Sequence, residues 1–215
     1  MHFLKNLAAV LVRPRATMAR ILPDPRPKIV LLLFVLAVVS GIFGDFDAPM
    51  MQQVVHQSGG GRVALIVAGV ILGLTVVLTA LCWFYAWVPY LAGRFLGGTG
   101  DVGGVRAATA WGLAPAIWAL LYRVPAAIWL APSAATSVNM RGGNVTFDPG
   151  RLSQGCGVAL VFAIVEFLIL VWCAFVMSNT VAEAHRFSAW HALGTLVISA
   201  IAPLIVVAAA VLAMM

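Results

Sequence analysis

Charged residues are scarce in this chain. Only 9% of its 215 residues are charged, 13 basic against 7 acidic, whereas 63% are hydrophobic. A soluble domain carries roughly 25% charged residues. The few charges here could not cover a soluble surface, so the composition excludes a soluble globular protein. It also leaves little sequence for a folded catalytic domain outside a membrane.

Catalytic and ligand-binding patterns are missing as well. The sequence contains no Ser/His/Asp set, no paired intramembrane carboxylates and no Walker loop. Its three cysteines form no CxxC pair. Glu183, His185 and His191 lie close together in the sequence, but their spacing matches no HExxH-type zinc site. We therefore expect no enzymatic activity, no metal, no cofactor and no nucleic-acid partner.

One glycine motif invites a nucleotide-binding interpretation. Residues Gly98–Gly103 match GxGxxG. A dinucleotide site needs a preceding strand and an acidic residue about 20 positions later, and neither is expected here. A tight cytoplasmic turn is the better interpretation, because glycine adopts positive φ at no steric cost. Asp101 is then placed to favour the N terminus of the helix that follows.

Long apolar runs are what the sequence does contain. A span of about 20 apolar residues can cross a bilayer as a helix, which satisfies its own backbone hydrogen bonds. The fold predicted is all-α and integral to the membrane: a bundle of five transmembrane helices (residues 29–215) after an N-terminal amphipathic interfacial helix within an arm (residues 1–28). The five spans are expected at residues 29–46, 63–91, 107–131, 155–180 and 191–215.

The basic residues predict the orientation. Nine of the 13 lie on the side of the N terminus, six of them in the arm, and three lie on the opposite side. The positive-inside rule then places the N terminus in the cytoplasm and, after five crossings, the C terminus outside. Arginine outnumbers lysine 11 to 2, with heavy use of Ala, Gly and Val, which indicates a bacterial inner membrane.

The arm is amphipathic. Phe3, Leu7, Val10, Leu11, Met18 and Ile21 share one helical face, and basic residues lie on its flanks or opposite side, with Pro14 expected to start a second helical turn. Such a helix lies in the headgroup plane and binds anionic lipid headgroups. The arm is interpreted mainly as a topology anchor; the alternative is a docking arm for a cytosolic partner. Its candidate surface residues are Lys5, Arg13, Arg15 and Arg20.

Two charges fall inside the spans. Arg123 lies in the third and Glu166 in the fourth, about 12 Å and about 17 Å from the outer ends at 1.5 Å per residue. Each is costly if it faces lipid. We expect an Arg123–Glu166 pair that locks the two spans together, with Asp45 as a rival partner for Arg123. The alternative is a polar pathway beside Pro115 and Pro125, which should kink the third span.

Helix association has one further signal. Gly69 and Gly73 form a GxxxG motif in the second span. Such a motif permits close helix approach, either within the chain or in a homo-oligomer.

Several short motifs resemble a known family. Arg13-Pro14-Arg15-Ala16-Thr17 in the arm is followed by Leu96-Gly97-Gly98-Thr99-Gly100-Asp101 and by Ala110-Trp111-Gly112-Leu113-Ala114-Pro115. Together they resemble the Yip1 domain family of five-span membrane proteins. The resemblance implies a cytosolic N terminus and an external C terminus. Eukaryotic members are associated with trafficking and Rab-type GTPases, a role that we do not transfer to a bacterial chain.

The function expected from the sequence is non-enzymatic. A Yip1-like integral membrane protein would organise the bilayer or scaffold protein partners through its basic arm. The alternative is a small transporter or channel that uses the kinked third span with Arg123 and Glu166.

Overall fold

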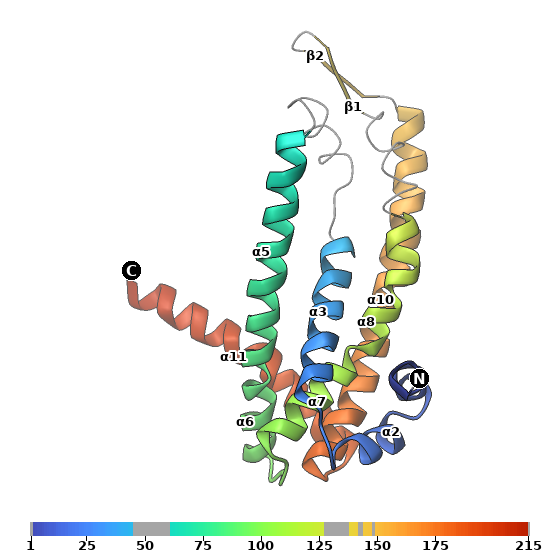
Figure 1. Ribbon diagram of the computed structural model, residues 1–215. Coiled ribbons are helices and arrows are strands. Elements are labelled where there is room, and N and C mark those ends of the chain that lie inside the picture. Colours follow the sequence, from blue (N-terminus) through green and yellow to red (C-terminus); the bar gives the residue numbers. More distant parts are fainter. Residues whose placement is uncertain (1, 45–60, 127–137, 142–143, 148, 215) are drawn as a thin grey trace.

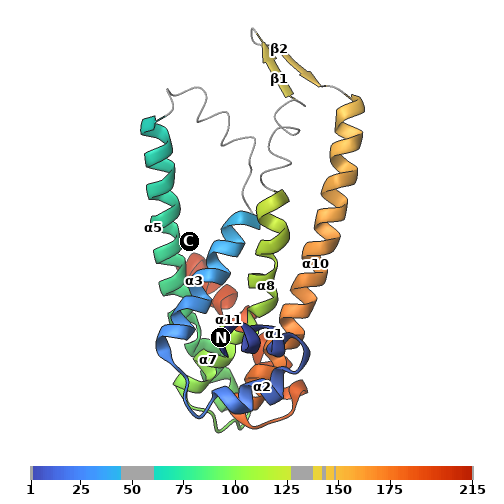
Figure 2. The same ribbon diagram turned by 45° about the vertical axis from the view of Figure 1, so that its right-hand side comes forward.

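The fold is a helical bundle. The computed structural model describes residues 2–44, 61–126, 138–141, 144–147 and 149–214, most of them helical. The upright helices are α3 (Pro27–Gly44), α5 (Gly61–Tyr85), α8 (Ala114–Trp118) and α10 (Pro149–His185). Helix α3 stands between α5 on one side and α8 on the other, and α8 packs on α10 (Figures 1 and 2).

Among the described residues, three stretches are long and apolar enough to cross a membrane. They are Pro27–Gly44, Leu65–Phe95 and Leu160–His185. The first agrees closely with the first predicted span. The second includes α5 and α6 (Trp87–Phe95), which are separated by a short interruption at Ala86. Pro89 accounts for that interruption, because it has no N–H to donate to the carbonyl of Tyr85.

The third predicted span is not one helix. It consists of α7 (Val102–Gly112), α8 and a further helical segment at residues 120–126. The first break is at Leu113, whose ψ of 3° is not helical, and Pro115 follows within the first two positions of α8. A second turn occurs at Ala119, and Pro125 lies in the last helical segment. This part of the chain therefore starts five residues earlier than expected and changes direction along its length.

The fourth predicted span is extended at both ends. Helix α10 has 37 residues and begins six residues before the predicted start. It follows a hairpin that the sequence did not predict, formed by β1 (Val138–Arg141) and β2 (Asn144–Phe147).

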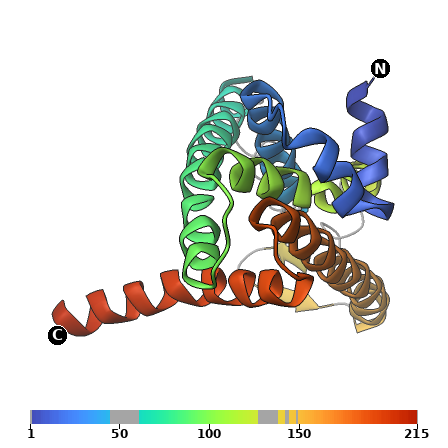
Figure 3. The same ribbon diagram turned by 90° about the horizontal axis from the view of Figure 1, so that it is seen from below.

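The last helix leaves the bundle. Helix α11 (Ala189–Met214) covers nearly all of the fifth predicted span. It packs on α6 and α10. Towards its middle, the hydroxyl of Tyr85, the last residue of α5, donates to the carbonyl of Ser199 at 2.8 Å. Beyond this contact it runs obliquely outward, so that the C terminus lies far from the other helices (Figures 1 and 3).

The buried core lies at the end of the bundle that carries the arm. It includes Leu33 and Phe34 of α3, Val105 and Trp111 of α7, and Val176 of α10. The contact between α7 and α10 is close because Gly112 has no side chain. A Cβ at that position would lie 2.9 Å from the Cα of Met177. Across the same contact the Thr180 hydroxyl donates to the carbonyl of Ala108 at 2.9 Å.

The rest of the bundle exposes apolar side chains. In the most apolar windows of Leu65–Phe95 and Leu160–His185, only 6% of residues are buried within the chain. Surfaces this apolar need a lipid or protein environment. Gly69 and Gly73 have nothing within 4 Å of their Cβ positions. The GxxxG motif therefore makes no close helix contact in the described part of the chain.

Candidate functional site

The structure brings Arg123 and Glu166 together in the middle of the bundle. The Arg123 Nε donates to Glu166 Oε1 at 2.7 Å, and Arg123 Nη2 pairs with Glu166 Oε2. This is a bidentate pair, the strongest geometry for a guanidinium and a carboxylate. The Arg123 side chain is 12% exposed and that of Glu166 is 36% exposed. Asp45, the rival partner, lies outside the described residues.

Two neutral residues complete the cluster, and sequence reasoning missed both. Arg123 Nη1 donates to the carbonyl of Ser40 at 2.7 Å and to its Oγ at 2.9 Å. The Ser40 hydroxyl in turn donates to the carbonyl of Ala116. On the other side, the Tyr122 hydroxyl donates to Glu166 Oε1. A lone hydroxyl in the apolar first span, and a tyrosine next to the buried arginine, were the signals available in the sequence.

The cluster links three parts of the fold. Ser40 belongs to α3, Arg123 to residues 120–126 after the broken helix, and Glu166 to α10. All three guanidinium nitrogens and both carboxylate oxygens have partners. Cavities of about 460 and about 560 Å³ lie elsewhere in the described structure, and neither is lined by Arg123 or Glu166. This arrangement is chemically suited to a clamp between helices, since its charges satisfy one another.

The basic arm consists of α1 (His2–Val12) and α2 (Pro14–Ile21), with Pro14 at the start of the second helix. Its apolar face is covered by protein. Leu7, Val10 and Met18 are buried in the core beside α7, α8 and α10. The face that the sequence assigned to the membrane surface is thus largely occupied by the bundle itself.

The basic side chains of α1 and α2 are exposed, and one of them also contacts the bundle. Lys5, Arg13 and Arg20 are exposed. Arg15 reaches the corner between α10 and α11, where its Nη2 donates to the carbonyl of Phe187 at 2.6 Å. Its Nε also lies 3.7 Å from Glu183 Oε2. Arg15 therefore fastens the arm to the bundle, a role that the charge pattern alone could not distinguish from lipid binding.

The glycine turn lies between α6 and α7, and it encloses His185. Gly97 has a φ of +87°, as a tight turn requires. Thr99 N donates to the carbonyl of His185 at 3.1 Å. The imidazole is 1% exposed and stacks on the ring of Phe187 with centroids 5.1 Å apart. Gly93 and Gly98 lie so close to this ring that neither could carry a Cβ.

The three residues considered for a metal site lie in different environments. Glu183 faces Arg15, and His185 is enclosed by the glycines. His191 Nδ1 is hydrogen-bonded to the Ser188 hydroxyl at 2.7 Å. Among the described residues, no three His, Cys, Asp or Glu side chains are grouped to hold a metal ion.

Asp101 caps α7, as the sequence predicted. Its Oδ2 accepts a hydrogen bond from Gly104 N at 3.0 Å. Replacing this residue with alanine should lower the free energy of unfolding by about 1 kcal/mol, because an N-terminal N–H loses its partner. Asp101→Asn keeps an acceptor and should match the wild type in thermal unfolding of the detergent-purified protein. Equal midpoints for the alanine and asparagine variants would contradict a capping role.

Taken together, apolar helices with exposed apolar faces and the Arg123–Glu166 ion pair between helices define an α-helical membrane protein. The sequence pattern of the Yip1 domain matches residues 8–211, nearly the whole chain. The chain therefore belongs to the Yip1 domain family. It matches no curated protein and no solved structure.

Proposed function

We propose that this Yip1-domain protein is a non-enzymatic scaffold that organises the membrane or holds protein partners through its basic arm. The observation that carries the proposal is the arrangement of the arm. Its apolar face is buried on the bundle, while Lys5, Arg13 and Arg20 remain exposed. A rigid, positively charged surface next to a membrane domain suits anionic headgroups or acidic segments of partner proteins.

The topology that goes with this function has five crossings. The N terminus lies in the cytoplasm and the C terminus outside, in a bacterial inner membrane. The basic residues support it, since nine of 13 lie on the side of the arm. The broken segment α7–α8 with residues 120–126 would form the third crossing, and α11 the fifth. The arm would lie along the cytoplasmic surface of the membrane.

A small transporter is the second candidate. The broken third segment next to a half-buried ion pair favours it, because interrupted helices form binding sites in transporters. Against it, the charged groups are paired with each other, and neither Arg123 nor Glu166 lines the two cavities described above. The scaffold is therefore our preferred function.

The two functions are separated by testing the arm and the pair independently. Partners would be cross-linked in membranes and compared between the wild type and Lys5→Ala/Arg13→Ala. The scaffold predicts partners that the arm variant loses and Glu166→Gln keeps. In proteoliposomes, it predicts no solute flux above that of protein-free vesicles. Flux that Glu166→Gln abolishes without loss of thermal stability would overturn the scaffold in favour of a transporter.

A further inference from the structure

A cavity of about 460 Å³ opens between the arm and the bundle. It is lined by Phe3, Asn6, Arg20, Ile21, Asp24, Arg26, Ile29 and Trp111. These residues come from α1, from the end of α2, from the turn before α3, from the first turns of α3 and from α7. Its size falls within the range of small-ligand sites.

The lining of this cavity is amphipathic. Two guanidinium groups, one carboxylate and one amide come from Arg20, Arg26, Asp24 and Asn6. The apolar part includes Trp111, which is 3% exposed, and Phe3, whose ring lies 5.8 Å from that of Trp111. Guanidinium groups bind phosphate through paired N–H donors. Aromatic and aliphatic walls instead bind hydrocarbon or a glycerol backbone.

The position of the cavity favours an amphiphilic ligand over a soluble anion. Helix α3 begins at Pro27, directly after Arg26, and it is long and apolar enough to cross a membrane. The cations of the cavity therefore lie where the apolar span meets the polar boundary. That is the level of lipid phosphates.

The net charge of the cavity lining further restricts the lipid headgroup that it can bind. Two arginines and one aspartate leave the cavity with a net charge of +1, which a phosphodiester of charge −1 balances. Asp24 is partly engaged by Arg26, with 3.4 Å between Oδ2 and Nε. A carboxylate at the rim accepts hydrogen bonds from hydroxyl groups. A headgroup with one phosphate and free hydroxyls satisfies both kinds of group.

From this combination we propose that the cavity is a specific site for an anionic phospholipid with a hydroxyl-bearing headgroup, of the phosphatidylglycerol type. The phosphate binds Arg20 and Arg26, a headgroup hydroxyl donates to Asp24, and the glycerol and upper acyl chain lie against Phe3 and Trp111. The site rests on the proposed function, because it holds the arm at the membrane surface. A specific site differs from non-specific electrostatic attraction between the arm and anionic lipid, because lipid binding then depends only on the residues that line the cavity.

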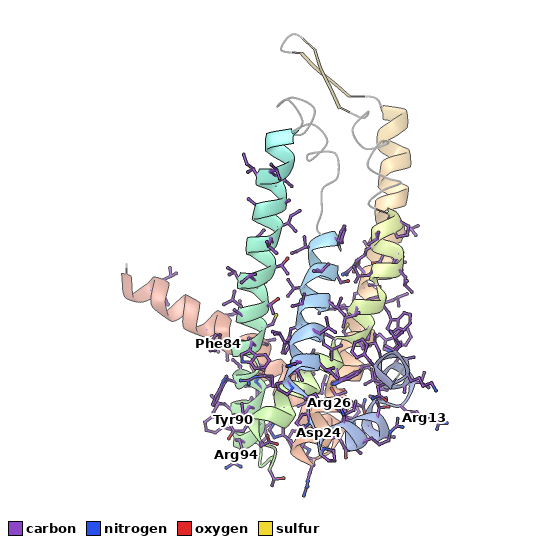
Figure 4. All side chains as sticks on the ribbon, viewed as in Figure 1. Arg13, Asp24, Arg26, Phe84, Tyr90 and Arg94 are labelled. Carbon is purple, nitrogen blue, oxygen red and sulfur yellow. The ribbon has the colours of Figure 1, made fainter. Side chains whose placement is uncertain are left out.

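The test uses the full-length protein in detergent and native mass spectrometry with added lipid. Phosphatidylglycerol should be retained about tenfold more tightly than phosphatidylcholine or phosphatidylethanolamine with the same acyl chains, since a charge-assisted contact is worth that factor. Arg20→Ala and Arg26→Ala should each weaken its retention by about tenfold. Arg94→Ala is the matched control, because Arg94 is an exposed arginine of α6 that does not line the cavity, and Figure 4 shows it near α6, apart from Asp24 and Arg26.

Three results would overturn the site. Equal losses for the cavity and control variants would mean diffuse attraction, which leaves the scaffold function intact. Equal retention of all three lipids would remove the headgroup selectivity. Displacement of the lipid by equimolar glycerol phosphate would assign the site to a soluble anion. Unfolding midpoints in lipid-free detergent, which Arg20→Ala should not change, keep a folding defect from being counted as lost binding. Loss of partners by the arm variant with lipid selectivity unchanged would show that site and scaffold are separate.

Discussion

Replacing Glu166 with alanine is expected to lower the free energy of unfolding by about 3 kcal/mol, because Arg123 is left charged in an apolar environment. The value is at the lower end for a broken buried pair, since the Glu166 side chain is 36% exposed. The measurement is the unfolding midpoint of the purified protein in detergent. Leu168→Ala, on the same helix and 59% exposed, is the control and should change little.

The same reasoning predicts that removing both charges is milder than removing one. The variant Arg123→Met/Glu166→Leu leaves no unpaired charge, and apolar replacement of a buried ion pair is often neutral or stabilising. Tyr122 would still lose its acceptor, so adding Tyr122→Phe should restore further stability. A double variant less stable than Glu166→Ala would show that the pair is not a simple clamp, and would return attention to the transporter.

The positions of the helices were largely predictable from the sequence. Apolar runs identify α3 and α5 with α6 to within four residues, and α10 to within six, because a membrane leaves few alternatives to a helix. The breaks within the third predicted span were harder to predict. Pro115 predicted an interruption, but the first break at Leu113 and the turn at Ala119 depend on local backbone geometry. The oblique course of α11 depends on its contacts with α6 and α10, which have no signal in a single sequence.

The candidate site was half predictable. The sequence alone identifies Arg123 and Glu166, since an unpaired charge in an apolar span carries a large unfavourable free energy. Ser40 and Tyr122 carry no charge, so only the folded geometry shows that they hold the pair. The arm shows a second limit of prediction from sequence. Its amphipathic pattern is correct, but periodicity cannot distinguish a face buried in lipid from one buried on α7, α8 and α10.

The close contact between α6 and the ring of His185 leads to the second large effect. Gly93→Ala should destabilise the protein by about 2 kcal/mol, because its Cβ would lie within 3.0 Å of three atoms of the His185 ring. The ring has little room to retreat, since it is 1% exposed and stacked on Phe187. Gly69→Ala is the matched control: nothing lies within 4 Å of its Cβ position, so higher helix propensity should leave it neutral or slightly more stable.

A double-mutant cycle identifies the ring as the cause. His185→Ala alone removes a buried side chain and should destabilise the protein, but combined with Gly93→Ala it should cost about 1 kcal/mol less than the sum of the two changes. Gly98→Ala should be rescued less completely, because its Cβ would also lie 2.8 Å from the backbone carbonyl oxygen of Gly93. Additive effects in thermal unfolding for Gly93→Ala and His185→Ala would mean that the His185 ring is not what excludes a Cβ from position 93. Rescue of Gly93→Ala together with only partial rescue of Gly98→Ala would assign Gly93 to the ring of His185, and Gly98 to both the ring and the close approach of the backbone.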